Sequence, residues 1–251
     1  MTTALVTGAS AGLGTEFTRQ LAAAGHDVVL VARDAERLAA LADELHRDHG
    51  VRTEVLPADL VAQDGLAAVR ARIEQDEDPV TVLVNNAGYG ILTDFIDTPV
   101  ADEQRMLRLL VEVPLVLGHT AIRAMATRGG GHVVNVSSVA GFIPRGSYGA
   151  AKAWLISFSR WANVRYRPRG VVVTAVCPGL VHTEFHRRME LDTRNIPGFA
   201  WLDAPRVVRE ALAGAFDGRA VVVPSKRYRV VVAASRVLPD RLMAAAGRLG
   251  R

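Results

Sequence analysis

TGASAGLG, residues Thr7–Gly14, follows the short apolar run Ala4–Thr7 and leads into a helical pattern at about 13–24. Glycines without a Cβ let the backbone turn tightly and approach a ligand. The N-terminus of the following helix offers N–H groups and the positive end of its dipole. Strand, turn and helix in this order predict a pyrophosphate site. The alternative is a glycine-rich connection that binds nothing. The expected contacts are Gly8, Ser10, Gly12, Leu13 and Gly14.

Six more apolar, mostly Val-rich runs repeat this pattern along the chain. The seven predicted strands are Ala4–Thr7, Val28–Ala32, Arg52–Leu56, Thr81–Asn85, His132–Val136, Val171–Val176 and Ala220–Val223. Helical patterns lie at about 13–24, 35–48, 62–76, 101–128, 147–166 and 204–216. Such alternation favours βαβ units and a doubly wound parallel sheet with helices on both faces. We therefore predict one α/β domain over residues 1–251.

Two segments break the alternation. Residues 182–202 have no clean period, and an insertion of this length in a compact domain is usually functional, so we expect a substrate loop there. Residues 224–251 are basic and apolar and predict a C-terminal helical segment. Such a segment can lie on anionic lipid, but we favour subunit packing or a cap over the substrate pocket.

Composition excludes several classes of protein. The net charge is +4, but basic residues alternate with acidic ones and no aromatic–basic motif occurs, so we expect no nucleic-acid partner. No apolar run is long enough to span a membrane. The N-terminus lacks the features of a signal peptide, and the single cysteine, Cys177, suits a reducing cytoplasm. We predict no metal site.

The end of the second predicted strand indicates the cofactor. In dinucleotide-binding folds an acidic residue there selects NAD, whereas an arginine accommodates the 2′-phosphate of NADP. This strand ends Ala32–Arg33–Asp34. Arg33 supplies a guanidinium, and Asp34 is more simply the N-cap of the next helix. We therefore expect NADP rather than NAD.

Other candidate ligand contacts follow the third, fourth and sixth strands. Ligands of open α/β sheets bind at these carboxyl ends. A purely structural role for Asn85 is as plausible here as a ligand contact. The candidates are Asp59, Leu60, Asn86, Ala87 and Gly88, and, in the sequence PGLVHT, Pro178, Gly179, Val181 and Thr183.

NVSSVAGFIPRGSYGAAK, residues Asn135–Lys152, carries the chemistry. Tyr148 and Lys152 are four residues apart and share a face if this stretch is helical. A nearby ammonium favours a phenolate, which suits an acid/base near neutrality. Lys152 is one of only two lysines among 30 basic residues. The alternative is an amphipathic helix with Tyr148 half buried and Lys152 solvated. Ser137 or Ser138 is positioned to hold a developing oxyanion.

Taken together, these motifs resemble the short-chain dehydrogenase/reductase superfamily over about residues 3–185. The resemblance implies a seven-stranded Rossmann fold and hydride exchange between a nicotinamide and a carbonyl or alcohol. Tyr148 would be the acid/base. Lys152 would lower its pKa and hold the nicotinamide ribose, and Ser138 would bind the substrate oxygen.

The resemblance also assigns the cofactor contacts and an oligomer. Asp59 would bind adenine, and Asn86 would bind near the adjacent ribose. Val181 and Thr183 would contact the carboxamide. The family is commonly dimeric or tetrameric through helices at about 101–128 and 147–166, so we expect a homodimer or homotetramer.

Two departures from the family pattern concern the site. Nine residues separate Ser138 from Tyr148 where the family more often has about a dozen, so the loop Phe142–Ser147 is short. Ser–Tyr contact should survive this shortening. The family also has an asparagine at or near Leu110, but no asparagine occurs between Asn86 and Asn135. Leu110 keeps a main-chain carbonyl for the proton relay and lacks the amide.

The sequence thus predicts an NADP-dependent oxidoreductase that acts on a ketone, aldehyde or secondary alcohol. The alternative is a non-catalytic NADP(H)-binding regulatory or scaffold protein, against which the complete Ser/Tyr/Lys set argues. Apolar and aromatic residues near the motifs suggest an apolar small-molecule substrate. Its expected walls are Tyr89, Phe142, Ile143, Phe185 and Trp201.

Overall fold

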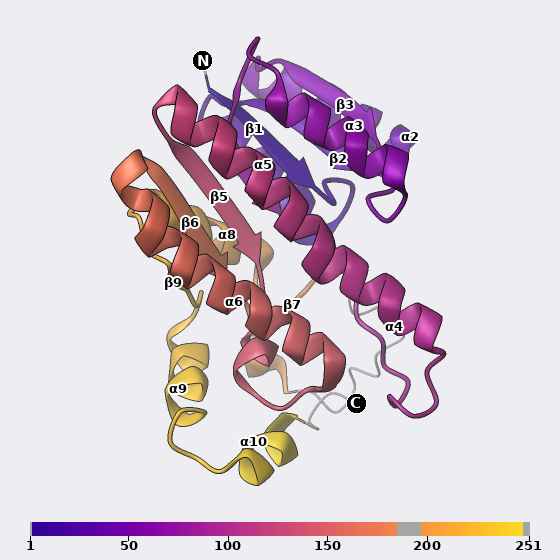
Figure 1. The fold of residues 1–251 in the computed structure, drawn as a ribbon, viewed down its shortest axis with the longest axis vertical. Helices are drawn as coiled ribbons and strands as arrows, with labels where there is room; N and C mark the ends of the chain where they lie inside the picture. The colour runs from indigo at the N-terminus through magenta and orange to yellow at the C-terminus, as the bar shows by residue number, and fades with distance from the viewer. Residues whose placement is uncertain (1, 185–196, 248–251) are drawn as a thin grey trace.

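A parallel seven-stranded sheet forms the centre of the computed structural model, which describes residues 2–184 and 197–247 (Figure 1). The strand order is β3-β2-β1-β4-β5-β6-β9. The doubly wound sheet is confirmed, and each predicted strand lies within one residue of its observed ends. The strands are β1 (Thr3–Thr7), β2 (Asp27–Ala32), β3 (Thr53–Pro57), β4 (Val80–Asn85), β5 (Gly131–Val136), β6 (Val171–Val176) and β9 (Val221–Val222).

Helices cover both faces of the sheet, as the apolar strands require. One face packs against α1 (Gly12–Ala23), α2 (Ala35–His49) and α8 (Ala204–Phe216). The other, in front in Figure 1, packs against α3 (Gln63–Glu74), α5 (Val113–Arg128) and α6 (Gly146–Tyr166). The apolar sides of the helices close two cores, one on each side of the sheet.

Local sequence signals set the ends of these helices. Asp34 caps α2 by accepting a hydrogen bond from the Arg37 amide at 3.0 Å, which confirms its predicted role. Asp203 caps α8 in the same way through Arg206. Helix α2 ends at Gly50 in the left-handed conformation, with φ of 68°, where glycine is the favoured residue.

The predicted helix at 101–128 is interrupted. It consists of α4 (Val100–Leu107), a π-helical turn η1 (Arg108–Glu112) and α5. Pro114 has no N–H to donate to the carbonyl of Leu110, four residues earlier, so regular α-helical bonding fails there. Such π turns occur frequently at functional sites.

The stretch Val100–Arg128 is also the one helix among the described residues that is long and apolar enough to cross a membrane. Half of its most apolar window is buried in the fold. Its α5 part contributes Val113, Leu117 and Met125 to the core on the sheet, as a core helix does.

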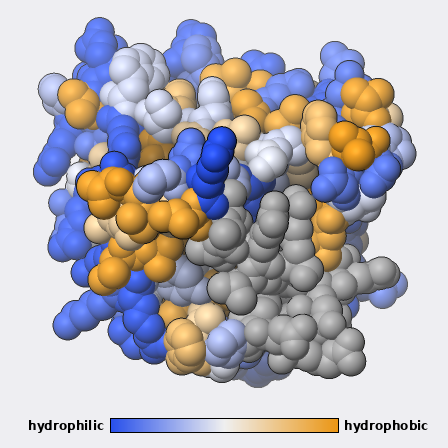
Figure 2. Space-filling view, turned by 90° about the horizontal axis from the view of Figure 1, so that it is seen from below, coloured by the Kyte–Doolittle hydropathy of each residue, from blue (hydrophilic) through white to orange (hydrophobic). Residues whose placement is uncertain are grey.

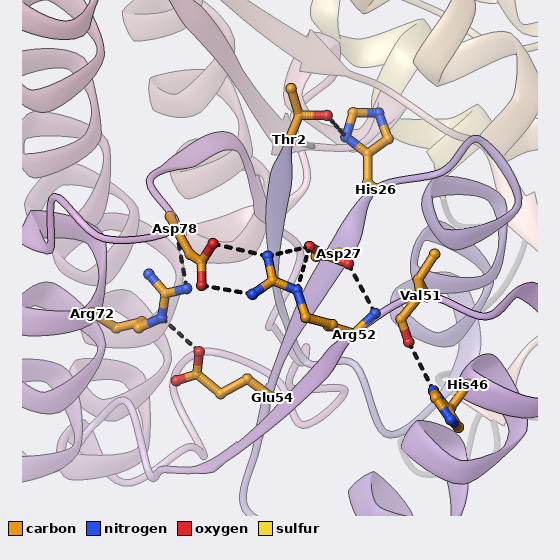
Figure 3. Close-up of polar contacts among 9 residues, drawn as sticks. All are labelled: Thr2, His26, Asp27, His46, Val51, Arg52, Glu54, Arg72 and Asp78. Atoms are coloured by element: carbon orange, nitrogen blue, oxygen red, sulfur yellow. Dashed lines mark hydrogen bonds and ion pairs between the residues drawn. The ribbon is translucent and has the colours of Figure 1, made fainter.

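An ionic network ties strand starts together at the amino ends of β2, β3 and β4 (Figure 3). The Arg52 guanidinium donates to buried Asp27 at 2.7 Å and to Asp78 at 2.8 Å. Buried Arg72 donates to Glu54 at 2.6 Å. These groups lie at the opposite ends of the strands from the glycine turn Gly8–Gly14, which is called the phosphate turn below. They therefore stabilise the fold without contributing to the predicted cofactor site.

The chain after β6 also contains short elements that show no period in the sequence. A two-stranded sheet pairs β7 (Leu180–Val181) with β8 (Trp201–Leu202), which follows the short turn η4 (Gly198–Ala200). The predicted C-terminal helical segment forms α9 (Lys226–Ala234) and α10 (Asp240–Gly247). Figure 2 shows apolar residues gathered over these helices, with hydrophilic residues around them. The exposed apolar side chains there are Val230, Val231, Val237, Leu238 and Leu242.

Candidate active site

The candidate site lies where the strand order reverses, between β1 and β4. Chain segments that leave these two strands run to opposite sides there, which opens a crevice at the carboxyl ends of the sheet. Figure 1 shows α4, α9 and α10 at this same end of the strands. Three segments border the crevice: the phosphate turn, the start of α6, and residues 137–145 (the serine loop), which carry Ser137 and Ser138.

The phosphate turn requires glycine. Gly8 and Gly12 have φ of 67° and 58°, the left-handed region that L side chains rarely adopt. A Cβ on Gly14 would lie 2.0 Å from the Gly8 carbonyl oxygen. Ala11 precedes α1 and has no side-chain cap to offer, so the first N–H groups of the helix remain available to an anion.

Asn86 holds this turn against β4. Its Nδ2 donates to the Thr7 carbonyl at 2.9 Å, and its own amide donates to Thr7 Oγ1 at 3.0 Å. The Ala87 amide donates to the same hydroxyl at 3.1 Å. The side-chain amide of Asn86 therefore has a structural task at the floor of the site, in addition to any contact with a ligand.

Ser138, Tyr148 and Lys152 are brought together where β5 ends and α6 begins. The Ser138 and Tyr148 hydroxyls are hydrogen-bonded to each other, so the short loop does not prevent their contact. The Lys152 Nζ lies 5.7 Å from the centre of the Tyr148 ring. Lys152 is only 6% exposed, which excludes a solvated surface lysine.

The predicted lowering of the Tyr148 pKa is wrong in this structure. Burial raises the pKa of Tyr148 to about 12, against a smaller opposite effect of the Ser138 hydrogen bond. The Lys152 ammonium donates to the Val136 carbonyl at 2.8 Å, and burial lowers the pKa of Lys152 to about 8. The phenol is therefore protonated at neutral pH, because burial is the largest influence on its pKa.

Ser137 has a different task from Ser138. It is buried, and its Oγ donates to the Lys152 carbonyl at 2.8 Å, which anchors α6 to the end of β5. Beneath it, Asn85 Nδ2 donates to Asn135 Oδ1 at 2.9 Å, and Asn135 Nδ2 donates to Ser159 Oγ at 2.9 Å. This buried chain fixes β4, β5 and α6 relative to one another, so Asn85 has a structural role in the fold.

The π turn places Leu110 at the site. Leu110 is buried with Met106 and Ala151, and Tyr89 and Tyr148 pack against this group. A Cβ on Gly88 would lie 2.9 Å from Leu110 Cδ2 and 3.9 Å from Lys152 Nζ. Leu110 and Lys152 thus face each other across Gly88.

Comparison with known proteins shows the family. The model of the short chain dehydrogenase family matches residues 2–194. The chain belongs to the short-chain dehydrogenase family. A 3-oxoacyl-[acyl-carrier-protein] reductase of Aquifex aeolicus is 30% identical over 183 residues, covering 72% of this chain and 74% of that protein. Its name shows that the family includes oxidoreductases of carbonyl compounds.

Solved structures of short-chain dehydrogenases share the whole fold. One from Sphingobium yanoikuyae in complex with NADPH has a TM-score of 0.86 and 33% identity, covering 94% of each chain. The bulky-bulky ketone specific alcohol dehydrogenase of Comamonas testosteroni has a TM-score of 0.81 and 32% identity, covering 94% of this chain and 92% of that one. This short-chain dehydrogenase is accordingly an oxidoreductase acting on CH–OH or C=O groups.

At the predicted adenosine end of this short-chain dehydrogenase, exposed Arg33 forms no ion pair with any described residue. Asp59 accepts hydrogen bonds from the Val61 amide at 3.1 Å and from Arg105 at 3.2 Å. Arg105, on α4, is a second guanidinium that the sequence did not reveal. Leu60 is buried in the core, which leaves only its main chain for a ligand.

The segment Pro178–Thr183, which carries the predicted carboxamide contacts Val181 and Thr183, lies over the phosphate turn. The Val139 amide donates to the Pro178 carbonyl at 3.0 Å, which joins this loop to the serine loop. Val181 is buried, and Thr183 lies against the turn, since a Cβ on Gly12 would be 3.2 Å from Thr183 Cβ. Among the phosphate-turn residues, Leu13 packs towards Val181, and Ser10 stays partly exposed.

The expected substrate walls fall into separate places. Tyr89 packs against the buried group of Met106 and Leu110 that Tyr148 also contacts. Phe142 packs against Ile156 and Cys177, and with Ile143 it lines a hollow that Asp240 of α10 also borders. Trp201 stacks on His182 with ring centres 4.6 Å apart. Phe185 lies outside the described residues.

Proposed function

We propose that this short-chain dehydrogenase transfers a hydride between NADP(H) and the carbonyl or secondary alcohol of an apolar small molecule. The observation that supports this most strongly is the Ser138–Tyr148 hydrogen bond beside a buried Lys152, at the mouth of a glycine-lined dinucleotide crevice. The NADPH-bound relative with the same fold supports the choice of cofactor.

The residues present fit a nicotinamide dinucleotide. Gly8, Gly12 and Gly14 leave a turn that a Cβ would block, and the uncapped start of α1 offers N–H groups to a pyrophosphate. Val181 and Thr183 would hold the carboxamide, and Asp59 the adenine. When bound, the reduced nicotinamide supplies a hydride to the carbonyl carbon.

Tyr148 would supply the proton. With its pKa at about 12 the phenol holds its proton at neutral pH and donates it to the carbonyl oxygen during reduction. Ser138 would hold that oxygen from the other side. Lys152 uses one of its three donors on Val136 and has two left for a ribose and a water.

The carbonyl of Leu110 would take the relay position that lacks an asparagine. Pro114 denies this carbonyl its α-helical donor, so it is open to hydrogen-bond a water near Lys152. We expect Pro114→Ala to restore helical bonding, to lower kcat about tenfold, the equivalent of ~1.4 kcal/mol, and to raise the Tm. Steady-state kinetics and a thermal scan measure both. A higher Tm with unchanged kcat would show that the carbonyl has no part in turnover.

Arg33 would select NADP by pairing with the 2′-phosphate. A charge-assisted hydrogen bond contributes about 1.5–3 kcal/mol. We therefore expect Arg33→Ala to raise the KM for NADP(H) roughly 10- to 100-fold and to leave the KM for NAD(H) unchanged. Arg47→Ala, near the far end of α2, is the matched control, because the one ion pair of Arg47 with a described residue is with neighbouring Asp48. An equal effect on both cofactors would contradict this role.

The structure also offers a surface for the proposed homo-oligomer. Leu115 on α5 and Trp161 and Val164 on α6 are exposed apolar residues on the outer layer of the fold. Trp161 belongs to an aromatic row with Trp154, Phe158 and Tyr166. We propose that these helices meet their copies in a homodimer or homotetramer, and that the protein works in the cytoplasm.

Oxidation of NADPH in the presence of a panel of carbonyl compounds tests the function. The panel should range from small aldehydes to bulky, doubly substituted ketones, with NADH as the parallel cofactor. We expect turnover of at least one apolar ketone, with NADPH preferred. Cofactor binding without turnover of any panel member would support a non-catalytic NADP(H)-binding protein instead.

A further inference from the structure

Tyr228 of the C-terminal helix α9 reaches across to the loop that follows β6. Its ring lies directly on Gly179, where an added Cβ would come within 2.1 Å of the ring carbons. Only glycine therefore fits beneath the ring. The contact joins a segment near the end of the chain to the loop that carries Val181 and Thr183.

The hydroxyl of Tyr228 joins the two strands of the small sheet. The Leu180 amide, at the start of β7, donates to the Tyr228 oxygen at 3.2 Å. The same hydroxyl donates to the Ala200 carbonyl, immediately before β8, at 2.7 Å. The Tyr228 oxygen thus links Leu180 to Ala200, and both hydrogen bonds are lost if this oxygen is removed.

Neighbouring contacts strengthen this attachment. The Arg227 guanidinium donates to the Phe199 carbonyl, so two consecutive residues of α9 hold the turn η4. The Tyr228 ring packs with Val181 and Leu202 in an apolar group that also contacts Leu13 of the phosphate turn. Helix α9 is therefore connected to the cofactor crevice through packed side chains.

We propose that Tyr228 is a positioning residue that fixes the Gly179–Thr183 loop over the phosphate turn and so sets the affinity for the nicotinamide half of the cofactor. This role rests on the proposed function. Thr183 already touches the turn at Gly12, so a shift of β7 displaces the groups proposed to hold the carboxamide. Within the described part of the chain, Arg33 and Asp59 at the adenosine end make no hydrogen bond or ion pair with α9, so that end should keep its geometry.

The variant Tyr228→Phe distinguishes the contribution of the hydroxyl from that of the ring. The phenyl group still packs on Gly179, so the variant should fold, but both hydrogen bonds are lost. We expect the Kd for NADPH, measured by nucleotide fluorescence, to rise about tenfold. The Kd for adenosine 2′,5′-bisphosphate, which lacks the nicotinamide half, should stay within twofold of wild type. A merely structural defect would weaken both ligands together.

Tyr166→Phe, at the far end of α6, is the matched control and should change neither Kd. Hydrogen exchange gives a reading that needs no ligand: the Leu180 amide should exchange faster in Tyr228→Phe, while β1 to β6 stay protected. Equal NADPH affinity in wild type and Tyr228→Phe, or equal weakening of both ligands, overturns the inference. Failure of wild type to bind either ligand overturns the proposed function instead.

Discussion

Tyr148→Phe is expected to reduce turnover by at least 10²- to 10⁴-fold, the range that a positioned acid contributes. The phenyl ring still fills the space beside Leu110 and Ala151, so folding and the crevice are preserved. The dissociation constant of NADPH should change by less than about threefold, since one contact at most is lost. Steady-state kinetics on an active ketone and fluorescence titration measure the two effects.

Tyr166→Phe removes a hydroxyl from the other end of the same helix and serves as the control. It should keep wild-type turnover. Tyr148→Phe with turnover within threefold of wild type would remove Tyr148 from the chemistry. A parallel loss of turnover and NADPH binding would instead point to a general collapse of the crevice.

Lys152→Met is expected to abolish most activity and to make the protein slightly more stable at neutral pH. Burial lowers the pKa of Lys152 from 10.5 to about 8, so the charged form costs the folded state roughly 3 kcal/mol at about 1.4 kcal/mol per pKa unit. Methionine removes this cost but leaves the Val136 carbonyl without its donor, at ~1–3 kcal/mol. The net expected gain at pH 7 is ~1 kcal/mol.

The buried Lys152 should make the stability of wild type increase with pH. Below about pH 8, Lys152 is protonated in both the folded and the unfolded wild type, so the folded state carries the full free-energy cost of burying the charged ammonium. Above the unfolded pKa neither holds it, so the cost disappears. The free energy of unfolding of wild type should therefore rise by roughly 3 kcal/mol relative to that of Lys152→Met as the pH rises from about 8 to 10.5. Denaturant unfolding at several pH values measures this difference.

Lys226→Met is the matched control, because Lys226 is the other lysine of the chain and is exposed. Its unfolding free energy should follow that of wild type at every pH. If the stability difference between Lys152→Met and wild type is the same at all pH values, the buried ammonium is not titrating as described.

The sequence predicted the sheet closely because most of its strands have a clear local sequence pattern. Most are Val-rich runs bounded by a turn or a helical period, and Asp34 could be read as a cap from its position alone. The strands β7 and β8 have two residues each, too few for any period, so they were missed. Pro114 was a readable signal for the interrupted helix, because it cannot donate to Leu110.

The sequence predicted that Ser138, Tyr148 and Lys152 lie close together, but it did not predict the electrostatics of this group. Spacing brought Ser138, Tyr148 and Lys152 together, but a pairwise argument on Tyr148 and Lys152 omits the burial that reverses the expected pKa shift of the phenol. Arg105 of α4 contacts Asp59, and Tyr228 of α9 contacts Leu180, through tertiary contacts that no local motif encodes. Such residues become visible only when the fold places them.

Deuterium transfer from NADPH labelled at the reactive position of the nicotinamide tests the central claim most directly. With a ketone that the panel identifies, the alcohol product should gain one deuterium on the former carbonyl carbon, as mass spectrometry and NMR would show. Tyr148→Phe should form almost none of this product. Alcohol that forms without the label, or NADPH that is consumed while the ketone stays intact, would contradict hydride transfer at this site.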